Sequence, residues 1–484
     1  MNLKVVSRNV GMALLVSALF MFLSMIVSIL NGHDSALAAL GISFAITFVV
    51  GMFPFIFVRQ SSNITLKDGY MIIVLSWFLS FVFGMLPYVL WGGPFTISNA
   101  WFESVSGFTA TGATILEDIE ELPKSLLFWR SSTHFIGGLG VVVFLLLIIP
   151  NSSPMRLRLT NMELSSMSRD AYRRGTTNTV NIFATVYLVI TASAILSYYL
   201  AGMSFFDAVN HGMSVGATGG FSTHSESIGF FHSTTINIVT MVFMVLSSLH
   251  FGLLFLTVVT RSFRPLNNPV LKYYLSSLLV MSVIAALSLK FHGNVESWGK
   301  AFMDGTFHII SYASTTGFAI ADNSSWPMLP CFLLVLMSIQ CGCAGSTTGG
   351  LKSDRVLILG KSISRHVKLA LHPSSVKEVR IGKTTIRDEE LFPFILYIAM
   401  YFLLMAVSVI VCLVVGDNNA DALTGTLASL GNVGPALGDI GSYGNFNHLT
   451  DTSKLMFTLD MFFGRVEIYP ILAVFSMIFN RKHY

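Results

Sequence analysis

Charged residues are scarce in this chain, and their scarcity excludes an ordinary soluble domain. Of its 484 residues, 53% are hydrophobic and only 11% are Asp, Glu, Lys or Arg, whereas soluble domains carry about 25% charged residues. Cysteine is also rare, and Cys341 and Cys343 have no partners at the spacing of a metal site. We therefore expect a membrane protein in which the four cysteines fill apolar space.

Long apolar segments are abundant instead. Ten windows are long and apolar enough to span a bilayer, which takes about 20 residues. They are 10–31, 37–58, 69–92, 126–149, 180–201, 234–259, 271–290, 328–358, 391–415 and 450–479. The first window lacks a small-residue cleavage site, which favours a spanning segment over a cleaved signal peptide. An even number of spans places both termini on one side of the membrane.

Basic residues are concentrated in alternate loops of this ten-span arrangement. The basic loops lie within 156–174, 261–272 and 352–387, whereas the loops on the opposite side of the membrane contain acids such as Glu117 and Asp439. The positive-inside rule places the basic loops in the cytoplasm. We therefore predict a multi-pass protein with both termini cytoplasmic.

A glycine-centred motif occurs four times at nearly even spacing between apolar segments. The copies are Thr109–Gly112, Gly216–Gly219, Ser314–Gly317 and Gly431–Gly434. Each final glycine follows a favoured helix N-cap residue by twelve or thirteen positions, and these residues are Asn99, Asp207, Asp304 and Asp421. The pattern predicts a short helix that enters the membrane from outside and turns back at the motif. An ordinary extracellular loop with a capped turn is the alternative.

The recurrence of the motif divides the chain into two leading spans and four parallel units. We predict two N-terminal transmembrane helices in 1–67 and pore repeats in 68–150, 179–261, 269–360 and 390–484. Each repeat would consist of a span, a pore helix, the motif and a second span, arranged around a central pore. The predicted fold class is an all-α integral membrane protein.

The motifs have the composition of an ion filter. Backbone carbonyls can replace the water shell of potassium if the chain turns them toward one axis, and such a turn often requires the positive φ that glycine adopts easily. The predicted filter glycines are Gly112, Gly219, Gly317 and Gly434. The residues before them would add carbonyls: Ala110, Thr111, Ala217, Thr218, Thr315, Thr316, Asn432 and Val433. Glu103, Asp207, Asp304 and Asp421 would either add negative potential at the outer mouth or serve only as caps and surface charges.

These residues resemble the Trk/Ktr/HKT superfamily of potassium transporters, and within it the bacterial membrane subunits of the TrkH type. The similarity extends to Phe128–Arg130, Gly137–Gly140, Gly342–Lys352 and Gly464–Ile468, and it covers essentially the whole chain. It implies potassium uptake across the bacterial inner membrane. Gly112 favours potassium, since serine at the first filter glycine is associated with sodium preference in the plant branch. Ala110 departs from the Thr-Thr-Gly that family filters often carry in the first copy.

Two features below the predicted filter differ between the repeats. Non-helical backbone at membrane depth must line a cavity or be buried in protein, and a charge there marks a functional site. The resemblance implies a gating loop at Gly342–Gly350, and an arginine in the pore, Arg465, that repels cations or holds the loop shut. The gate residues would be Gly342, Gly345, Ser346, Thr347, Thr348, Gly349, Gly350 and Arg465. A kinked helix without a gating role, and an interhelical ion pair of Arg465, are the alternatives. We expect Arg130, near a helix end, to be structural.

The resemblance also implies partners. It suggests a homodimer and a cytoplasmic nucleotide-binding regulatory subunit of the TrkA type. The basic linkers 151–178 and 361–389 would be docking surfaces, although cytoplasmic loops are basic in any case. Any ATP or NAD would bind that partner, because this chain lacks a GxxxxGK[ST] loop. We expect no cofactor here, with K⁺ as the transported ion.

Two other functions compete with a potassium channel. One is a symporter coupling potassium entry to protons or sodium, although the sequence has no obvious paired midplane carboxylates. The other is a membrane enzyme, which we disfavour because the histidines in or beside the spans show neither metal-ligand spacing nor a matched acid. These are His134, His211, His250 and His308, and we expect them to be packing groups.

Overall fold

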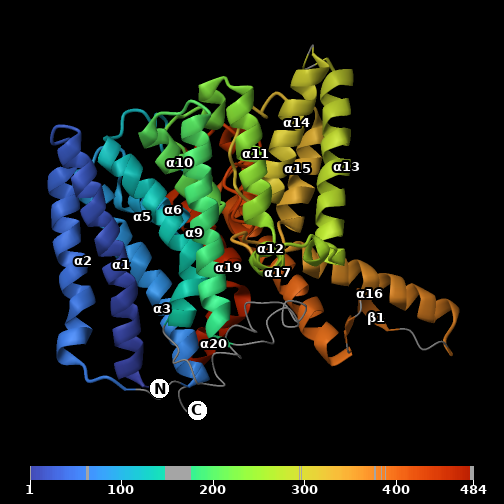
Figure 1. Cartoon of the computed structure of the whole chain (residues 1–484), viewed down its shortest axis with the longest axis horizontal. Helices are drawn as coiled ribbons and strands as arrows, with labels where there is room; N and C mark the ends of the chain where they lie inside the picture. The colour runs from blue at the N-terminus through green and yellow to red at the C-terminus, as the bar shows by residue number, and fades with distance from the viewer. Residues whose placement is uncertain are drawn as a thin grey trace.

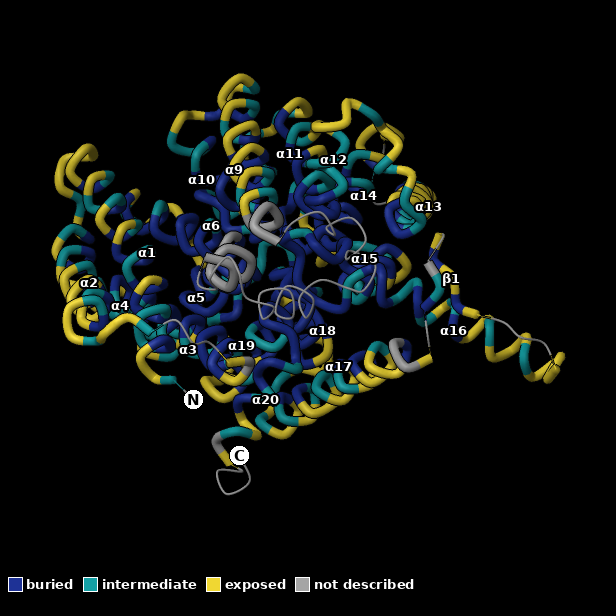
Figure 2. The backbone as a smooth tube through the Cα atoms, turned by 60° about the horizontal axis from the view of Figure 1, so that its bottom comes forward, coloured by how far each residue is buried: buried dark blue, intermediate teal, exposed yellow. Residues whose placement is uncertain are grey.

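The computed structural model describes residues 2–61, 65–147, 176–293, 295, 297–374, 378–382, 384–386 and 388–479, and helices dominate them. Nearly all of the linker 151–178 lies outside this range, so the docking surface predicted there is not described. Buried residues are concentrated in the middle of the molecule, and exposed residues cover the surrounding helices (Figure 2). Since many of the exposed side chains are large and apolar, the outer surface suits a lipid environment.

Two N-terminal helices, α1 (Leu3–Leu30) and α2 (Leu37–Phe57), pack side by side at one edge of the molecule (Figure 1). A Cβ atom on Gly11 would lie 2.7 Å from the carbonyl oxygen of Gly51, so glycine lets the two helices approach closely. Helix α1 also contacts α3 (Leu66–Gly84) and α6 (Lys124–Leu147). This pair therefore packs against the first of the segments that contain the glycine motifs.

Each of the four motif-bearing segments contains a helix of 12 to 16 residues directly before its motif. The first two segments add α4 (Leu86–Trp91), α5 (Ile97–Phe108), α9 (Thr176–Leu200), α10 (Phe205–Ala217), η2 (Ser227–Phe231), α11 (Thr234–Ser248) and α12 (Phe251–Thr260). The third contains η3 (Arg264–Leu266), α13 (Pro269–Phe291), α14 (Trp298–Ala313) and α15 (Met328–Gln340). The fourth contains α17 (Asp388–Val415), α18 (Asn419–Leu430), η4 (Gly438–Ile440), α19 (Asp451–Val466) and α20 (Ile468–Phe479).

The short helices α5, α10 and α18 begin about one turn before the predicted caps, so the prediction that Asn99, Asp207 and Asp421 are N-caps is wrong. The hydroxyl of Thr96 accepts a hydrogen bond from the Asn99 amide, and the hydroxyl of Ser204 accepts one from the Asp207 amide. Asn418 caps α18, and Asp304 lies in the second turn of α14. In α5, α10 and α18 the residue three positions earlier in sequence acts as the N-cap of the first turn. Asn99, Asp207 and Asp421 therefore lie inside the first turn.

Several of the ten apolar windows predicted are not single straight helices. Six described helices are long and apolar enough to cross a membrane, or seven if α11 and α12 form one bent span. The window 234–259 is not one straight helix, because α11 and α12 meet at an angle of 100°. The window 328–358 is interrupted after Gln340, as the polar run at 342–350 predicted, and the window 450–479 breaks at Glu467, where φ is 69°.

Helix α1 begins and α20 ends on the same side of the molecule, the lower side in Figure 1. Helix α16 (Ser353–Leu371) leaves the bundle on that side. It is followed by a short antiparallel pair, β1 (Val379–Ile381) and β2 (Thr384–Ile386), in which Arg380 is opposite Thr385. The linker 361–389 was predicted as surface helix and loop, and the hairpin is an addition that its polar sequence did not indicate.

Candidate functional site

Helices α5, α10, α14 and α18 end in the same backbone turn. In each turn a left-handed residue stands two positions before a glycine with positive φ. The left-handed residues are Ala110 (φ 50°), Thr218 (56°), Thr315 (54°) and Asn432 (53°), and the glycines are Gly112 (84°), Gly220 (81°), Gly317 (75°) and Gly434 (94°). The amide of the residue between them bonds to a carbonyl five residues earlier at 2.8–2.9 Å in all four turns, as in a Schellman motif. The four motifs are therefore copies of one local structure.

The equivalence of the turns corrects the predicted register of the second motif. Gly220, not Gly219, has the positive φ that the other three motif glycines share. Thr218 and Gly219 are then the equivalents of Ala110 and Thr111, and Ala217 is the last residue of α10. The prediction that placed Gly219 at the positive-φ position is wrong by one residue, because two adjacent glycines end the motif and sequence alone does not distinguish them.

The four turns touch one another in a closed ring. A Cβ atom added to any of the positive-φ glycines would overlap a backbone carbonyl oxygen of the next motif: Gly112 with Gly219, Gly220 with Thr316, Gly317 with Val433, and Gly434 with Thr111. The carbonyls come from the residue directly before the glycine in every case. Two independent reasons thus require glycine at each of these positions: its positive φ and the close approach of another backbone.

The carbonyl oxygens of this ring have no backbone donors among the described residues. In the described parts of the chain no amide donates to the carbonyl of Thr111, Gly219, Thr316 or Val433, although all four residues are buried. Buried backbone carbonyls are nearly always paired. A group of four without N–H partners is therefore a site that can accept a cation.

An open cavity lies directly over the ring. All four positive-φ glycines line it, together with Arg130, Tyr443 and other residues of the loops that follow the motifs. Gly219 is not among the lining residues. The cavity therefore gives access to the same four glycines that the backbone angles identify.

On the other side of the ring lies the buried segment between α15 and α16, which we call the intramembrane loop (Cys341–Lys352). Its Gly349 amide donates to Thr315 Oγ1 at 3.3 Å, and Thr347 Oγ1 donates to the Gly216 carbonyl at 3.2 Å. A Cβ atom on Gly349 would overlap the side chain of Asn432. The loop is therefore in direct contact with the motif ends of the second, third and fourth segments.

The break between α11 and α12 holds the loop from the side. The Cys343 amide donates to the Ser248 carbonyl at 3.0 Å, and the Phe251 amide donates to the Gly345 carbonyl at 2.9 Å. Gly345 has a φ of 78° and packs against the His250 ring. The bend that replaced the predicted straight span thus supplies backbone groups to the loop.

Arg465 connects the intramembrane loop to α6. Its guanidinium donates to the carbonyl of Thr347 and, at 3.2 Å, to the carbonyl of Gly137. Only 7% of the residue is exposed. Of the two roles expected for this arginine, its contacts favour holding the loop in place.

Comparison with known proteins identifies the family. The TrkH family, described as cation transport proteins, matches residues 37–484. The chain belongs to the TrkH family. It is 31% identical to the Trk system potassium uptake protein TrkH of Salmonella typhimurium over all of both chains, and 31% identical to TrkG of Escherichia coli over 99% of both. The crystal structure of the potassium transporter TrkH from Vibrio parahaemolyticus matches with a TM-score of 0.89 and 29% identity, over 99% of this chain and 100% of that one.

The family assignment decides several expectations. The predicted superfamily is confirmed, and so is the prediction that the chain is not an enzyme, because the family consists of transporters. Membership and the apolar helices together make this TrkH-family chain a multi-pass membrane protein. The four histidines expected to be packing groups are all buried. His134 bonds to Ser214, and His211 bonds to Ser222.

Sequence reasoning missed an ion-pair cluster at the base of the intramembrane loop of this TrkH-family chain. Glu467, in the break between α19 and α20, pairs with Arg355 at 2.8 Å and lies 3.8 Å from Lys352. The Arg355 guanidinium also lies 3.9 Å from the centre of the Tyr397 ring. Glu467 and Arg355 are 112 positions apart, and no local pattern joins them.

The four acids expected at the outer mouth differ in their surroundings. Glu103 is fully buried and pairs with Arg130 at 2.7 Å, so neither of the two roles left open for it, negative potential at the mouth or a cap or surface charge, describes its surroundings. Asp207 accepts from Ser204 and Thr223. Burial raises the pKa of Asp304 to about 6, although Lys300 lowers it. Asp421 belongs to a separate cluster described below.

We expect the Arg130–Glu103 pair to be structural, as predicted for Arg130. Replacing Arg130 by Met leaves a buried carboxylate unpaired, which costs about 3 kcal/mol or more. Thermal unfolding of the purified protein in detergent should show a lower midpoint for Arg130→Met. The double variant Arg130→Met/Glu103→Gln should recover much of the loss. An unchanged midpoint in the single variant would contradict this role.

Proposed function

We propose that this TrkH-family chain takes up potassium through a filter formed by the four motif turns. The observation that carries the proposal is the closed ring in which each positive-φ glycine packs on a carbonyl of the next motif. Four segments that follow one another in sequence form one ring, and therefore one central pore within a single chain. The relatives named Trk potassium uptake proteins support potassium as the ion.

The coordinating groups would be main-chain oxygens. The proposed filter contains the carbonyls of Thr111, Gly219, Thr316 and Val433, flanked by those of the left-handed residues and the glycines. The side chains at these positions differ, whereas the backbone angles are alike. A filter of carbonyls tolerates such differences, because the oxygens that replace the hydration shell belong to the backbone.

The intramembrane loop would be the gate of this pore. Its contacts with Thr315, Gly216 and Asn432 support a position against the side of the ring opposite the cavity. Arg465 would hold the loop closed by bonding to the Thr347 carbonyl. The four similar turns would provide the ion selectivity of the pore. The loop and Arg465, each present in only one of the four segments, would control its opening.

Ion-selective flux into liposomes tests the proposed function. Purified protein should carry Rb⁺ and K⁺ at least tenfold faster than Na⁺, because the carbonyl ring suits the larger ions. The initial rate of ⁸⁶Rb⁺ uptake with and without competing K⁺ or Na⁺ measures this. Robust flux of Na⁺ alone would overturn the selectivity. Flux that requires a proton or sodium gradient would favour the symporter over the channel.

The Arg465 contacts predict a graded response to substitution. Arg465→Gln should raise basal flux several-fold, since it removes the hydrogen bonds to two different carbonyls. Arg465→Lys keeps the charge but cannot form the same fork of hydrogen bonds. Raised Rb⁺ flux in both variants supports loop holding. A low flux in Arg465→Lys alone would show that charge repulsion is the main effect, and loss of folded protein in both would indicate a purely structural role.

We further propose that the chain resides in a bacterial inner membrane with cytoplasmic termini, forms a homodimer, and binds a nucleotide-binding subunit of the TrkA type. Helix α16 leaves the bundle on the side of the chain ends, and its Lys361, Arg365 and Lys368 support a cytoplasmic location for that side. The exposed helix and hairpin would offer a docking surface. Charge reversal of Lys368, measured by co-purification with such a subunit, tests the docking.

A further inference from the structure

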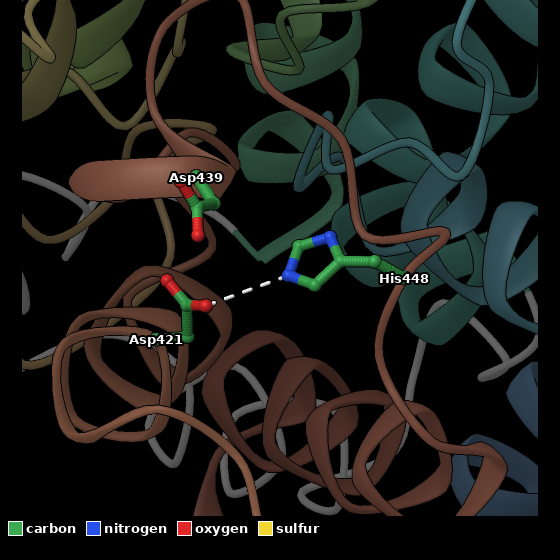
Figure 3. Close-up of side chains that lie close together, drawn as sticks. All are labelled: Asp421, Asp439 and His448. Atoms are coloured by element: carbon green, nitrogen blue, oxygen red, sulfur yellow. Dashed lines mark hydrogen bonds and ion pairs between the residues drawn. The ribbon is translucent and has the colours of Figure 1, made fainter.

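Two carboxylates and an imidazole converge beside the fourth motif (Figure 3). Asp421 lies in the first turn of α18, Asp439 in η4, and His448 in the loop before α19. One possible ligand atom from each lies within 4.8 Å of the other two. The cluster is at the end of α18 away from the intramembrane loop, which is the external side in the proposed function.

Only one oxygen of the Asp421 carboxylate has a hydrogen-bond partner in the described structure. Its side chain is only 2% exposed, and its Oδ2 lies 3.4 Å from His448 Nε2. Its other oxygen, Oδ1, is buried and has no hydrogen-bond partner in the described structure. Figure 3 shows this carboxylate directed toward the space between Asp439 and His448. A buried acceptor without a donor is costly, so the geometry points to a ligand.

The charge of the cluster indicates a cation. Two carboxylates this close repel each other unless a positive charge lies between them. A divalent ion would neutralise both and would give Asp421 Oδ1 a partner.

We propose that Asp421, Asp439 and His448 bind one divalent transition-metal ion such as Zn²⁺. Bond lengths of about 2.0–2.2 Å to nitrogen and oxygen put tetrahedral ligand atoms about 3.4 Å apart, which matches the separation of Asp421 Oδ2 and His448 Nε2. An imidazole nitrogen beside carboxylates favours Zn²⁺, Co²⁺ or Ni²⁺ over Ca²⁺ and over the transported monovalent ions. Water would complete the coordination.

The bound ion would tie the wall of the outer cavity to α18. The segment that carries Asp439 continues through Ile440, Gly441 and Tyr443, which line the cavity over the motif glycines. The ligands come from both ends of this segment and from the start of α18. The ion would therefore add a cross-link between α18, η4 and the loop before α19, where Thr424 of α18 already bonds to Leu437 just before η4.

Metal titration of the tag-free, full-length protein in detergent tests the proposal. Isothermal titration with Zn²⁺ should show one equivalent bound per chain, and Co²⁺ should give visible absorption bands of a low-symmetry site. His448→Gln and Asp439→Asn should each weaken Zn²⁺ binding at least tenfold. Both side chains are exposed, so these variants should fold. The matched control is His292→Gln, an exposed histidine after α13, which should bind as the unchanged protein does.

Two results would overturn the metal site. Either no stoichiometric binding would be seen, or binding would persist with the same affinity in His448→Gln and Asp439→Asn. Because the titration needs no ion flux, its failure is separate from failure of the proposed potassium uptake. A Zn²⁺-dependent rise in the thermal unfolding midpoint, absent from both ligand variants and present in His292→Gln, would support the site independently.

Discussion

Removing Gly345–Gly349 from the intramembrane loop should raise basal Rb⁺ flux at least tenfold. These five residues include the groups that bond to Thr315 and to the Gly216 carbonyl. They also include Thr347, whose carbonyl accepts from Arg465. If the loop blocks the pore, its removal opens the path below the filter. Uptake of ⁸⁶Rb⁺ into liposomes containing equal amounts of folded protein measures the change.

The structure makes this deletion feasible, because the ends of the loop already meet. The Ser353 amide donates to the Gly342 carbonyl at 2.8 Å, and Ser353 Oγ donates to the Cys341 carbonyl at 2.6 Å. The tip can therefore be removed while the base stays closed. Glu467, Arg355 and Lys352 also lie outside the deleted residues.

The control for the deletion is Ser346→Ala, because the described hydrogen bonds of this hydroxyl stay within the loop, to the Cys343 carbonyl and to the Thr348 hydroxyl and amide. It should leave basal flux near that of the unchanged protein. Unchanged or lower flux in the deleted protein, with a normal elution profile, would argue that the loop is not a gate. The interruption of the 328–358 window would then be structural.

Replacing Gly220 by Ala should lower Rb⁺ flux at least tenfold. Its φ is 81°, and an added Cβ would overlap the carbonyl oxygen of Thr316. Since that oxygen belongs to the ring, the backbone must shift where the proposed filter coordinates potassium. Flux in liposomes, with the ratio of Rb⁺ to Na⁺ rates, measures the effect.

A matched set of variants tests whether Gly219 or Gly220 is the filter glycine of the second motif. The set also shows how much flux is lost merely because alanine is strained at a positive φ. Gly202→Ala also has a positive φ, 104°, but no heavy atom lies within 4 Å of the added Cβ, so it should keep most of its flux. In Gly219→Ala the Cβ would overlap the His134 ring, a side chain that can be shortened. Flux should therefore return in Gly219→Ala/His134→Ala, whereas His134→Ala should not restore Gly220→Ala. The opposite pattern of rescue would favour Gly219 as the filter glycine.

The motif chemistry was predictable because it is local. A left-handed turn at the end of a helix favours glycine wherever it occurs, so four such turns leave a visible repeat in the sequence. The polar run at 342–350 likewise predicted a broken helix, since its seven glycine, serine and threonine residues cannot form an apolar span. Predictions that needed a choice between near-equivalent neighbours, such as Gly219 against Gly220, failed.

The sequence by itself determined that this is a membrane protein with four related glycine turns, an interrupted helix after the third turn and an arginine within an apolar stretch after the fourth. These features follow from composition and from backbone preferences of single residues. Only the tertiary structure decided which glycine faces the next motif, where α11 bends, which carbonyls Arg465 reaches, and that Asp421 meets Asp439 and His448. Each of these depends on close contact between segments distant in sequence, and such contacts are set by packing rather than by any local pattern.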